Sequence, residues 1–194
     1  MADEPLREMW DTRHGDPLKR PSVAQVLVEN LHLLPAQGSA LDLACGLGGN
    51  ALALAEKGLQ TTAWDLSPVA VERLQAFAAE RGLTRLTAEV RDVEGDPPPA
   101  GCFDVIVVSH FLSRPLIPHL SAALRPGGLI FYQTFTRIAV SDTGPSNPEY
   151  RLGDNELLRL FDGLRVRVYR EENRLGDTDL GVRDVAMLVA ERVL

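Results

Sequence analysis

The chain has 194 residues, of which 45% are hydrophobic and 24% charged. This is the composition of an ordinary globular protein, and it excludes global disorder. The formal net charge of −7 disfavours a nucleic-acid substrate, because an acidic surface repels phosphate backbones. No stretch approaches the roughly 20 apolar residues of a membrane helix. With two cysteines, no CxxC pattern and no signal-peptide pattern, we expect a cytoplasmic protein.

The first half of the chain predicts three strands and their helices. Residues 1–20 are polar and predict a short helix or arm. Pro21 and Ser22 open a predicted helix, with apolar residues every three or four positions up to Leu34. A strand over 39–43 leads through a small-residue loop into a helix over 48–57. A strand over 60–64, ending at Asp65, precedes a helix that starts at the serine cap and proline of 67–68. A third strand covers 85–90.

The second half continues this alternation and then departs from it. Three prolines make 94–101 an irregular loop. The β-branched run 103–109 is typical of a strand buried on both faces. A proline-broken helix over 114–124 and a turn over 125–128 lead to a strand over 129–135. The long loop 136–152 is a functional candidate. A short helix over 154–161 precedes strands over 164–170 and 182–193, which lack a crossover helix and should be antiparallel.

Alternating strands and helices predict the α/β class. We expect a Rossmann-like, doubly wound sheet of seven strands, mostly parallel with an antiparallel C-terminal strand. Residues 1–194 are predicted to form a single domain, with 1–20 as an N-terminal arm or lid.

The stretch Asp42-Leu43-Ala44-Cys45-Gly46-Leu47-Gly48 joins a strand to a helix. Such a loop presents backbone N–H groups at a helix N-terminus and lets a ligand approach closely. Its spacing differs from the Gly-x-Gly-x-x-Gly of dinucleotide-binding loops. It is similar to the acidic-x-Gly-x-Gly-x-Gly motif of class I S-adenosylmethionine-dependent methyltransferases. Alanine replaces the first glycine, which costs little where only a small side chain is needed.

The resemblance extends from Pro21 to the C-terminus and implies S-adenosylmethionine as the cofactor and S-adenosylhomocysteine as the product. It implies that Asp42 helps to hold the methionine ammonium group, directly or through the loop. Asp65, ending the second strand, would accept from the ribose hydroxyls. Asp92, in Arg91-Asp92-Val93, would accept from the adenine amino group. Each of these two acids also has a simpler interpretation when it is taken alone. Asp65 could be an acidic residue that precedes a helix cap, and Asp92 could be a solvated acid in a loop. The other cofactor contacts that the resemblance implies are Ala44, Cys45, Gly46, Asn50, Leu66, Val93 and Ser109.

Within the family, the chain looks most like the small tellurite-resistance and thiopurine methyltransferases. The signs are the arm with Trp10 and Arg13, and the sequence Asn-Pro-Glu-Tyr-Arg-Leu at 147–152. The resemblance implies that Trp10 stacks near the adenosine and that Arg13 meets the methionine carboxylate. The alternative is an ordinary surface helix with one buried tryptophan.

Three residues are candidates for the acceptor side. His110 follows the fourth strand and is the candidate general base, because an unperturbed pKa of ~6.5 suits proton removal at neutral pH. The alternative is a core or helix-start histidine. Tyr150 and Arg151 are candidates for lining the acceptor pocket, or else they anchor the loop. The other histidines show no ligand spacing, so no metal site is predicted.

These features predict methyl transfer to a small molecule. A thiol or metalloid oxyanion would need little help from a base, whereas a hydroxyl would need one. The alternatives are a non-catalytic S-adenosylmethionine-binding protein and, less favoured by the loop spacing, an NAD-dependent Rossmann oxidoreductase. We expect a monomer or homodimer without nucleic-acid or membrane partners.

Overall fold

The computed structural model describes residues 4–193, so Met1–Asp3 of the predicted arm and Leu194 lie outside the described residues. These residues contain one seven-stranded sheet of order β3-β2-β1-β4-β5-β7-β6. β1 to β5 run parallel, and β7 pairs antiparallel with both β5 and β6. The predicted Rossmann-like sheet is therefore confirmed. The strands are β1 (Ser39–Leu43), β2 (Gln60–Asp65), β3 (Leu86–Val90), β4 (Phe103–Ser109), β5 (Leu124–Phe135), β6 (Arg165–Arg170) and β7 (Val185–Glu191).

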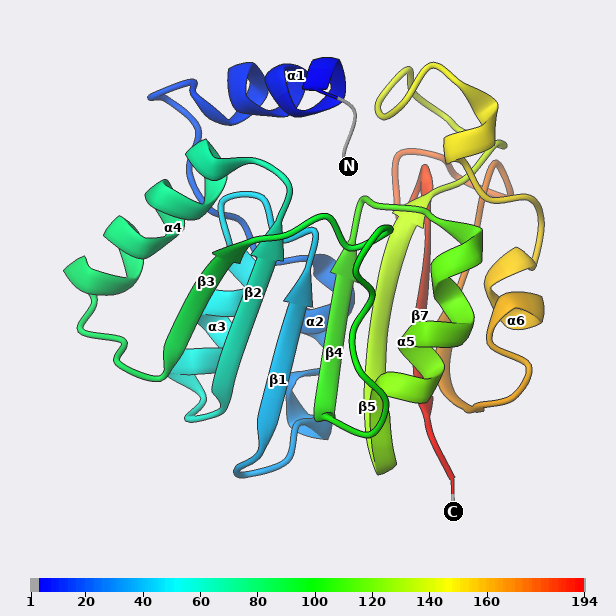
Figure 1. The fold of residues 1–194 in the computed structure, drawn as a ribbon. Coiled ribbons are helices and arrows are strands. Elements are labelled where there is room, and N and C mark those ends of the chain that lie inside the picture. The colour runs from blue at the N-terminus through cyan, green and yellow to red at the C-terminus, as the bar shows by residue number, and fades with distance from the viewer. Residues whose placement is uncertain (1–3, 194) are drawn as a thin grey trace.

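Helices cover both faces of the sheet. Figure 1 shows α2, α3 and α4 behind it and α5 and α6 in front. It also shows α1 lying above the edge where the parallel strands end, with the segment 136–152 above the end of β5. The helices are α1 (Glu4–His14), α2 (Gln25–Glu29), α3 (Gly49–Glu56), α4 (Pro68–Glu80), α5 (Ile117–Ala123) and α6 (Glu156–Leu160), with short 3₁₀ turns at Leu31–Leu33, Arg114–Leu116 and Pro148–Tyr150.

Side chains along β4 point alternately to the two faces of the sheet, and both faces are covered, which explains why this strand is apolar throughout. Ile106 and Val108 pack in the core under α5 and α6, whereas Val105 and Val107 pack in the core under α2. Successive strand residues point to opposite faces, so a central strand covered on both sides needs an unbroken apolar run.

The prediction that a helix begins at Pro21 is wrong. The chain stays extended through Ala24, and α2 spans only Gln25–Glu29. The reason lies in two buried side chains from elsewhere in the chain. Asn50 Oδ1 accepts from the N–H of Ala24, and Gln133 Oε1 accepts from the N–H of Val26. These bonds satisfy N–H groups that have no partner within the helix, and they fix its start.

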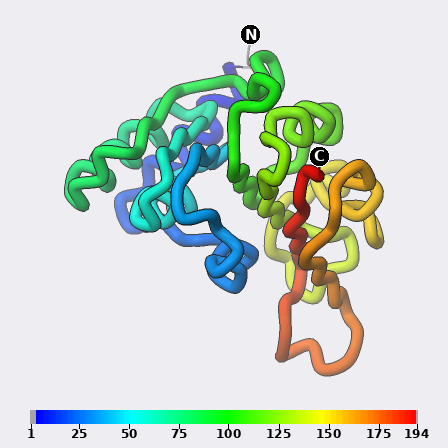
Figure 2. Tube along the Cα trace, turned by 90° about the horizontal axis from the view of Figure 1, so that it is seen from below, coloured from blue at the N-terminus to red at the C-terminus, as the bar shows by residue number. Residues whose placement is uncertain are grey.

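Two further segments differ from a regular alternating pattern. β5 begins at Leu124, so the Arg-Pro-Gly-Gly turn is absorbed into an irregular strand start, where the pairing with β4 shifts register. β3 connects to β4 through the proline-containing segment without a helix. The remaining predicted elements agree with the structure apart from their ends. Figure 2 shows the connection between β6 and β7 extending away from the rest of the molecule.

Across residues 4–193, no helix combines the length and the apolar character that crossing a membrane requires. The organisation of 1–194 as a single domain remains a prediction.

Candidate cofactor and acceptor site

The loop between β1 and α3 follows a left-handed path. The φ angles of Ala44, Gly46 and Gly48 are +54°, +52° and +75°. A Cβ on Gly48 would lie 2.2 Å from Leu74 Cδ1, so both conformation and space require glycine there. Position 44 needs a left-handed backbone as well as a small side chain. The alanine therefore carries strain of about 1–2 kcal/mol that a size argument misses.

Asp42 lies fully buried beneath this loop. Its Oδ2 accepts from the N–H of Ala51 at 2.9 Å, and Asn50 Nδ2 lies 3.4 Å from its Oδ1. Burial raises the pKa of Asp42 to about 8, so the side chain is mostly protonated at neutral pH. In this position Asp42 holds the start of α3. Its contact with a methionine ammonium group, directly or through the loop, remains a prediction.

Asp65 ties the end of β2 to the same loop. One carboxylate oxygen accepts from the N–H of Gly46 at 2.7 Å, and the other from the N–H of Ser67 at 2.9 Å. Each oxygen keeps a second lone pair, which is the acceptor capacity that ribose hydroxyls would use. Leu66 beside it is half-buried. The ribose and adenine roles of these two residues remain predictions.

The side chain of Asp92 makes hydrogen bonds within its own loop. Its Oδ1 accepts from the N–H groups of Glu94 and Gly95, which starts the irregular segment after β3. Val93 is buried in the core on the α5 side. Cys45 donates its backbone N–H to Trp64, and burial raises the pKa of its thiol. The predicted contacts of Asp92, Val93 and Cys45 with the cofactor are not tested by this geometry.

The end of β4 carries Ser109 and His110. The hydroxyl of Ser109 accepts from Asn50 Nδ2 at 3.1 Å, so Asn50 links α2, α3 and β4. His110 has a φ of +56°, and its ring lies 4.9 Å from the ring of Phe135. Burial lowers the pKa of His110 below 6.5, which leaves the imidazole neutral at pH 7. Its Nε2 lies 3.4 Å from Nε2 of Gln133.

The arm reaches the loop through a residue that the sequence did not single out. Trp10 stacks with His14 at 5.6 Å, and the Arg13 guanidinium lies 5.2 Å from the Trp10 ring. His14 Cε1 is 3.1 Å from the point that a Cβ on Gly46 would occupy. The spacing of four residues that places Trp10 and His14 on one helix face was the signal available. Cofactor contacts of Trp10 and Arg13 remain predictions.

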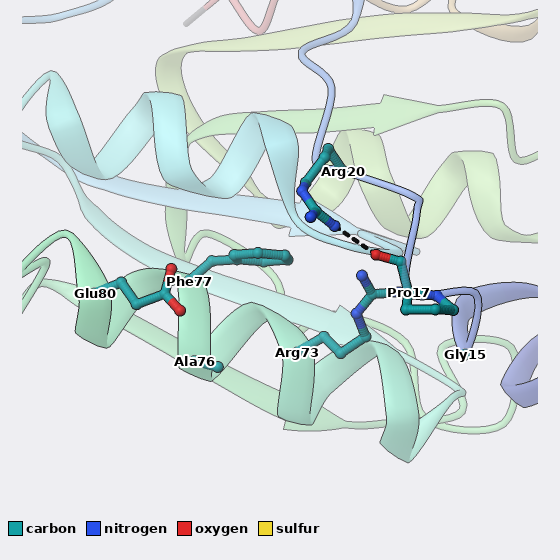
Figure 3. A pocket seen from close by; sticks show the side chains of 7 residues that line it. All are labelled: Gly15, Pro17, Arg20, Arg73, Ala76, Phe77 and Glu80. Atoms are coloured by element: carbon teal, nitrogen blue, oxygen red, sulfur yellow. Dashed lines mark hydrogen bonds between the residues drawn. The ribbon is translucent and has the colours of Figure 1, made fainter.

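Arg73, on α4, holds the segment that follows α1. Its guanidinium donates to the backbone oxygens of His14, Asp16 and Lys19. Asp11 adds a second attachment by accepting from the hydroxyl of Ser67. Figure 3 shows Arg73 beside a surface hollow of about 430 Å³ that lies between this segment and α4. The hollow is lined by residues of the attachment and not by the loop after β1.

Tyr150 and Arg151 hold different positions in the 136–152 segment. Arg151 donates to the backbone oxygens of Thr136, Thr143 and Pro145 at 2.6 to 3.0 Å. Tyr150 is 58% exposed. Arg151 therefore anchors the loop, which was the alternative to its pocket role. Contact of either residue with an acceptor remains a prediction.

Three of the residues predicted to bind an adenosine cofactor lie at the ends of neighbouring parallel strands. The ends of β2, β3 and β4 carry Asp65, Asp92 and Ser109, and β1 lies between β2 and β4. In open α/β sheets, ligands bind outside the strand ends where the strand order reverses, which here is between β1 and β4. Among the residues of the described range, no group of three or more His, Cys, Asp or Glu side chains is placed to hold a metal ion.

Comparison with known proteins agrees with this geometry. Residues 40–128 match a family model described as a methyltransferase domain. A 2-heptyl-1-hydroxyquinolin-4(1H)-one methyltransferase from Mycobacteroides abscessus is 36% identical over 91 residues, which are 45% of this chain and 40% of that protein. A ubiquinone biosynthesis O-methyltransferase from Xanthomonas axonopodis is 29% identical over 136 residues, which are 66% of this chain and 56% of that protein. The chain thus spans about half the length of the curated relatives it matches.

The solved structure of TehB from Haemophilus influenzae has the same fold. Its TM-score is 0.71 at 19% identity, with 94% of this chain and 67% of TehB covered. The part of the chain from 40 to 128 is thus similar to a methyltransferase domain and lies within a Rossmann-like sheet. The likeness to TehB is one of fold, and the match to a methyltransferase domain supports S-adenosylmethionine as the expected cofactor.

Proposed function

We propose that the protein transfers the methyl group of S-adenosylmethionine to a hydroxyl group of a small-molecule acceptor. The observation that supports this most directly is His110, a histidine kept neutral at the end of β4. Attack by a hydroxyl requires removal of its proton, and a neutral imidazole has the lone pair for this step. The names of the two curated relatives, one acting on a hydroxyquinolinone and one an O-methyltransferase, support the same acceptor class.

Bound S-adenosylmethionine would supply a methyl group on a sulfonium, which is already electrophilic. The chain then has three tasks. The loop at Gly46 and the carboxylate of Asp65 hold the adenosine end. The arm and the 136–152 segment lie over the strand ends and exclude water (Figure 1). His110 takes the proton of the acceptor hydroxyl on its imidazole.

A thiol or metalloid oxyanion remains the competing acceptor, since neither needs a base. Release of S-adenosylhomocysteine, measured with a phenol, a hydroxyquinolinone, a thiol and tellurite, separates the two. For hydroxyl acceptors, we expect His110→Ala to lower kcat by about 10²- to 10⁴-fold. His119→Ala on the exposed side of α5 is the matched control. Turnover with thiols alone, or full activity of the His110 variant, would contradict the proposal.

A further inference from the structure

His110 has one polar side-chain neighbour within hydrogen-bonding distance in the described part of the chain, and that neighbour is Gln133. Gln133 is 5% exposed and lies on β5, paired with Ser109 in the register of the two strands. Its amide nitrogen is 3.4 Å from His110 Nε2. Within residues 4–193, His110 forms no ion pair with a carboxylate. The buried amide is thus the polar group that faces the ring.

The orientation of the Gln133 amide is set from the other side. Its oxygen accepts from the N–H of Val26 at 2.9 Å, in the first turn of α2. A backbone N–H is a donor only, so the oxygen must face Val26 and the NH₂ group must face His110. If Oε1 and Nε2 of Gln133 exchanged places, the NH₂ group of the amide would face the N–H of Val26, and two donors would meet.

We propose that Gln133 is a positioning residue for His110, in which the start of α2 fixes the amide so that its NH₂ group faces Nε2 of the imidazole. The inference rests on the proposed function of His110 as the base. A neutral ring meets the amide with the lone pair of Nε2 and carries its own proton on Nδ1. A protonated ring would place an N–H against the NH₂ group, so the amide disfavours the imidazolium.

This arrangement links the start of α2 to the orientation of two buried amide side chains. Ala24 and Val26 donate to Asn50 and Gln133, and both amides then direct their NH₂ groups toward the end of β4. An acceptor hydroxyl would approach the Nε2 lone pair and replace the long contact with Gln133. Contacts of this kind are commonly loose before substrate binds.

The test is Gln133→Glu, which keeps the shape and the acceptor for Val26 while replacing the NH₂ group by a carboxylate oxygen. An opposite charge beside the ring favours the imidazolium. We expect the pKa of His110 to rise by about 1–3 pH units, measured by NMR titration of the full chain and assigned with His110→Asn. The acidic limb of kcat/KM should move to higher pH by the same amount. Gln25→Glu adds the same charge to the exposed side of α2 and should change neither value.

Three outcomes are informative. An unchanged His110 pKa in a folded Gln133→Glu variant overturns the inference. A pKa that rises together with the acidic limb supports both the inference and the proposed base. A pKa that rises while the rate profile stays in place supports the contact with Gln133 and contradicts the role of His110 as the base. Gln133→Met, which removes both hydrogen bonds, should change the pKa of His110 in the same direction but less than the carboxylate does.

Discussion

The imidazole of His14 lies directly against Gly46, with Cε1 3.1 Å from the position of a Cβ on that glycine. The two residues belong to elements far apart in the sequence, the arm and the loop after β1. Gly46 also donates its backbone N–H to Asp65 at 2.7 Å, so the ring lies against the loop residue that this carboxylate holds. The arm therefore shares a surface with the groups assigned to the cofactor, and it must either contribute His14 to binding or move when the cofactor enters.

Gly46→Ala tests this shared surface. The added Cβ meets His14, and φ of +52° is unfavourable for alanine, so the loop should be destabilised by about 1–2 kcal/mol and the arm displaced. Calorimetric titration should show weaker S-adenosylmethionine binding. Gly82→Ala is the control, because Gly82 has a φ of +65° and open space around it. Equal binding losses in the two variants would mean that contact with the arm is not involved.

Removal of residues 1–20 should reduce cofactor affinity or turnover, because it takes away both His14 and the cover over the strand ends. Arg73→Gln is a milder change that weakens the attachment of the arm to α4 without altering the arm itself. Arg81→Gln, at the end of the same helix, changes an exposed ion pair and serves as the control. A truncated protein with intact binding and turnover would show that the arm is not a lid.

Asp65→Ala should weaken S-adenosylmethionine binding by about 2–3 kcal/mol, through loss of acceptors for two hydroxyl groups. Because Asp65 also accepts from Gly46 and Ser67, the thermal stability of the variant has to be measured alongside calorimetry. Asp65→Asn keeps one oxygen and should lose less. Unchanged affinity in a folded alanine variant would contradict the assignment.

The buried carboxyl of Asp42 should make stability depend on pH in an unusual direction. Its pKa is about 8 when folded and 3.8 as the ordinary value, so between these limits the native state holds one more proton than the unfolded state. The free energy of unfolding should therefore fall as pH rises from about 4 to about 8. Asp42→Asn lacks this dependence. As the pH rises from 5 to 7, the free energy of unfolding of Asp42→Asn, measured with urea, should increase by about 2–3 kcal/mol relative to that of the unsubstituted protein. If the free energies of unfolding of the two proteins changed with pH in parallel, a raised pKa of Asp42 would be excluded.

Much of the fold could be predicted because its signals are local. The apolar run of β4, the Ser67-Pro68 start of α4 and the missing crossover before β7 each specify one element. The start of α2 could not be predicted in this way. Its N–H groups are satisfied by Asn50 and Gln133, which lie 26 and 107 residues away in the chain. No local pattern contains that information.

The candidate site shows the same division. Motif spacing brought Asp42, Gly46 and Asp65 together, and the structure places them in one hydrogen-bonded loop region. Side-chain orientation was less accessible, since Asp42 faces inward and Arg151 binds its own loop. The contact of His14 with Gly46 was missed because it depends on how the arm is attached to α4, and that attachment uses backbone oxygens that carry no sequence signature.

The helix-free connection from β3 to β4 leaves the outermost parallel strand with support on one side. α4 packs behind β3, while Thr87 and Glu89 are exposed. Strands with few buried side chains open at low free energy, so the backbone amides of β3 should exchange with deuterium ahead of those in β1 and β4. Asp92 follows this strand directly. A cofactor that engages Asp92 would slow exchange along β3, and the edge of the sheet would report occupancy from residues that never touch the ligand.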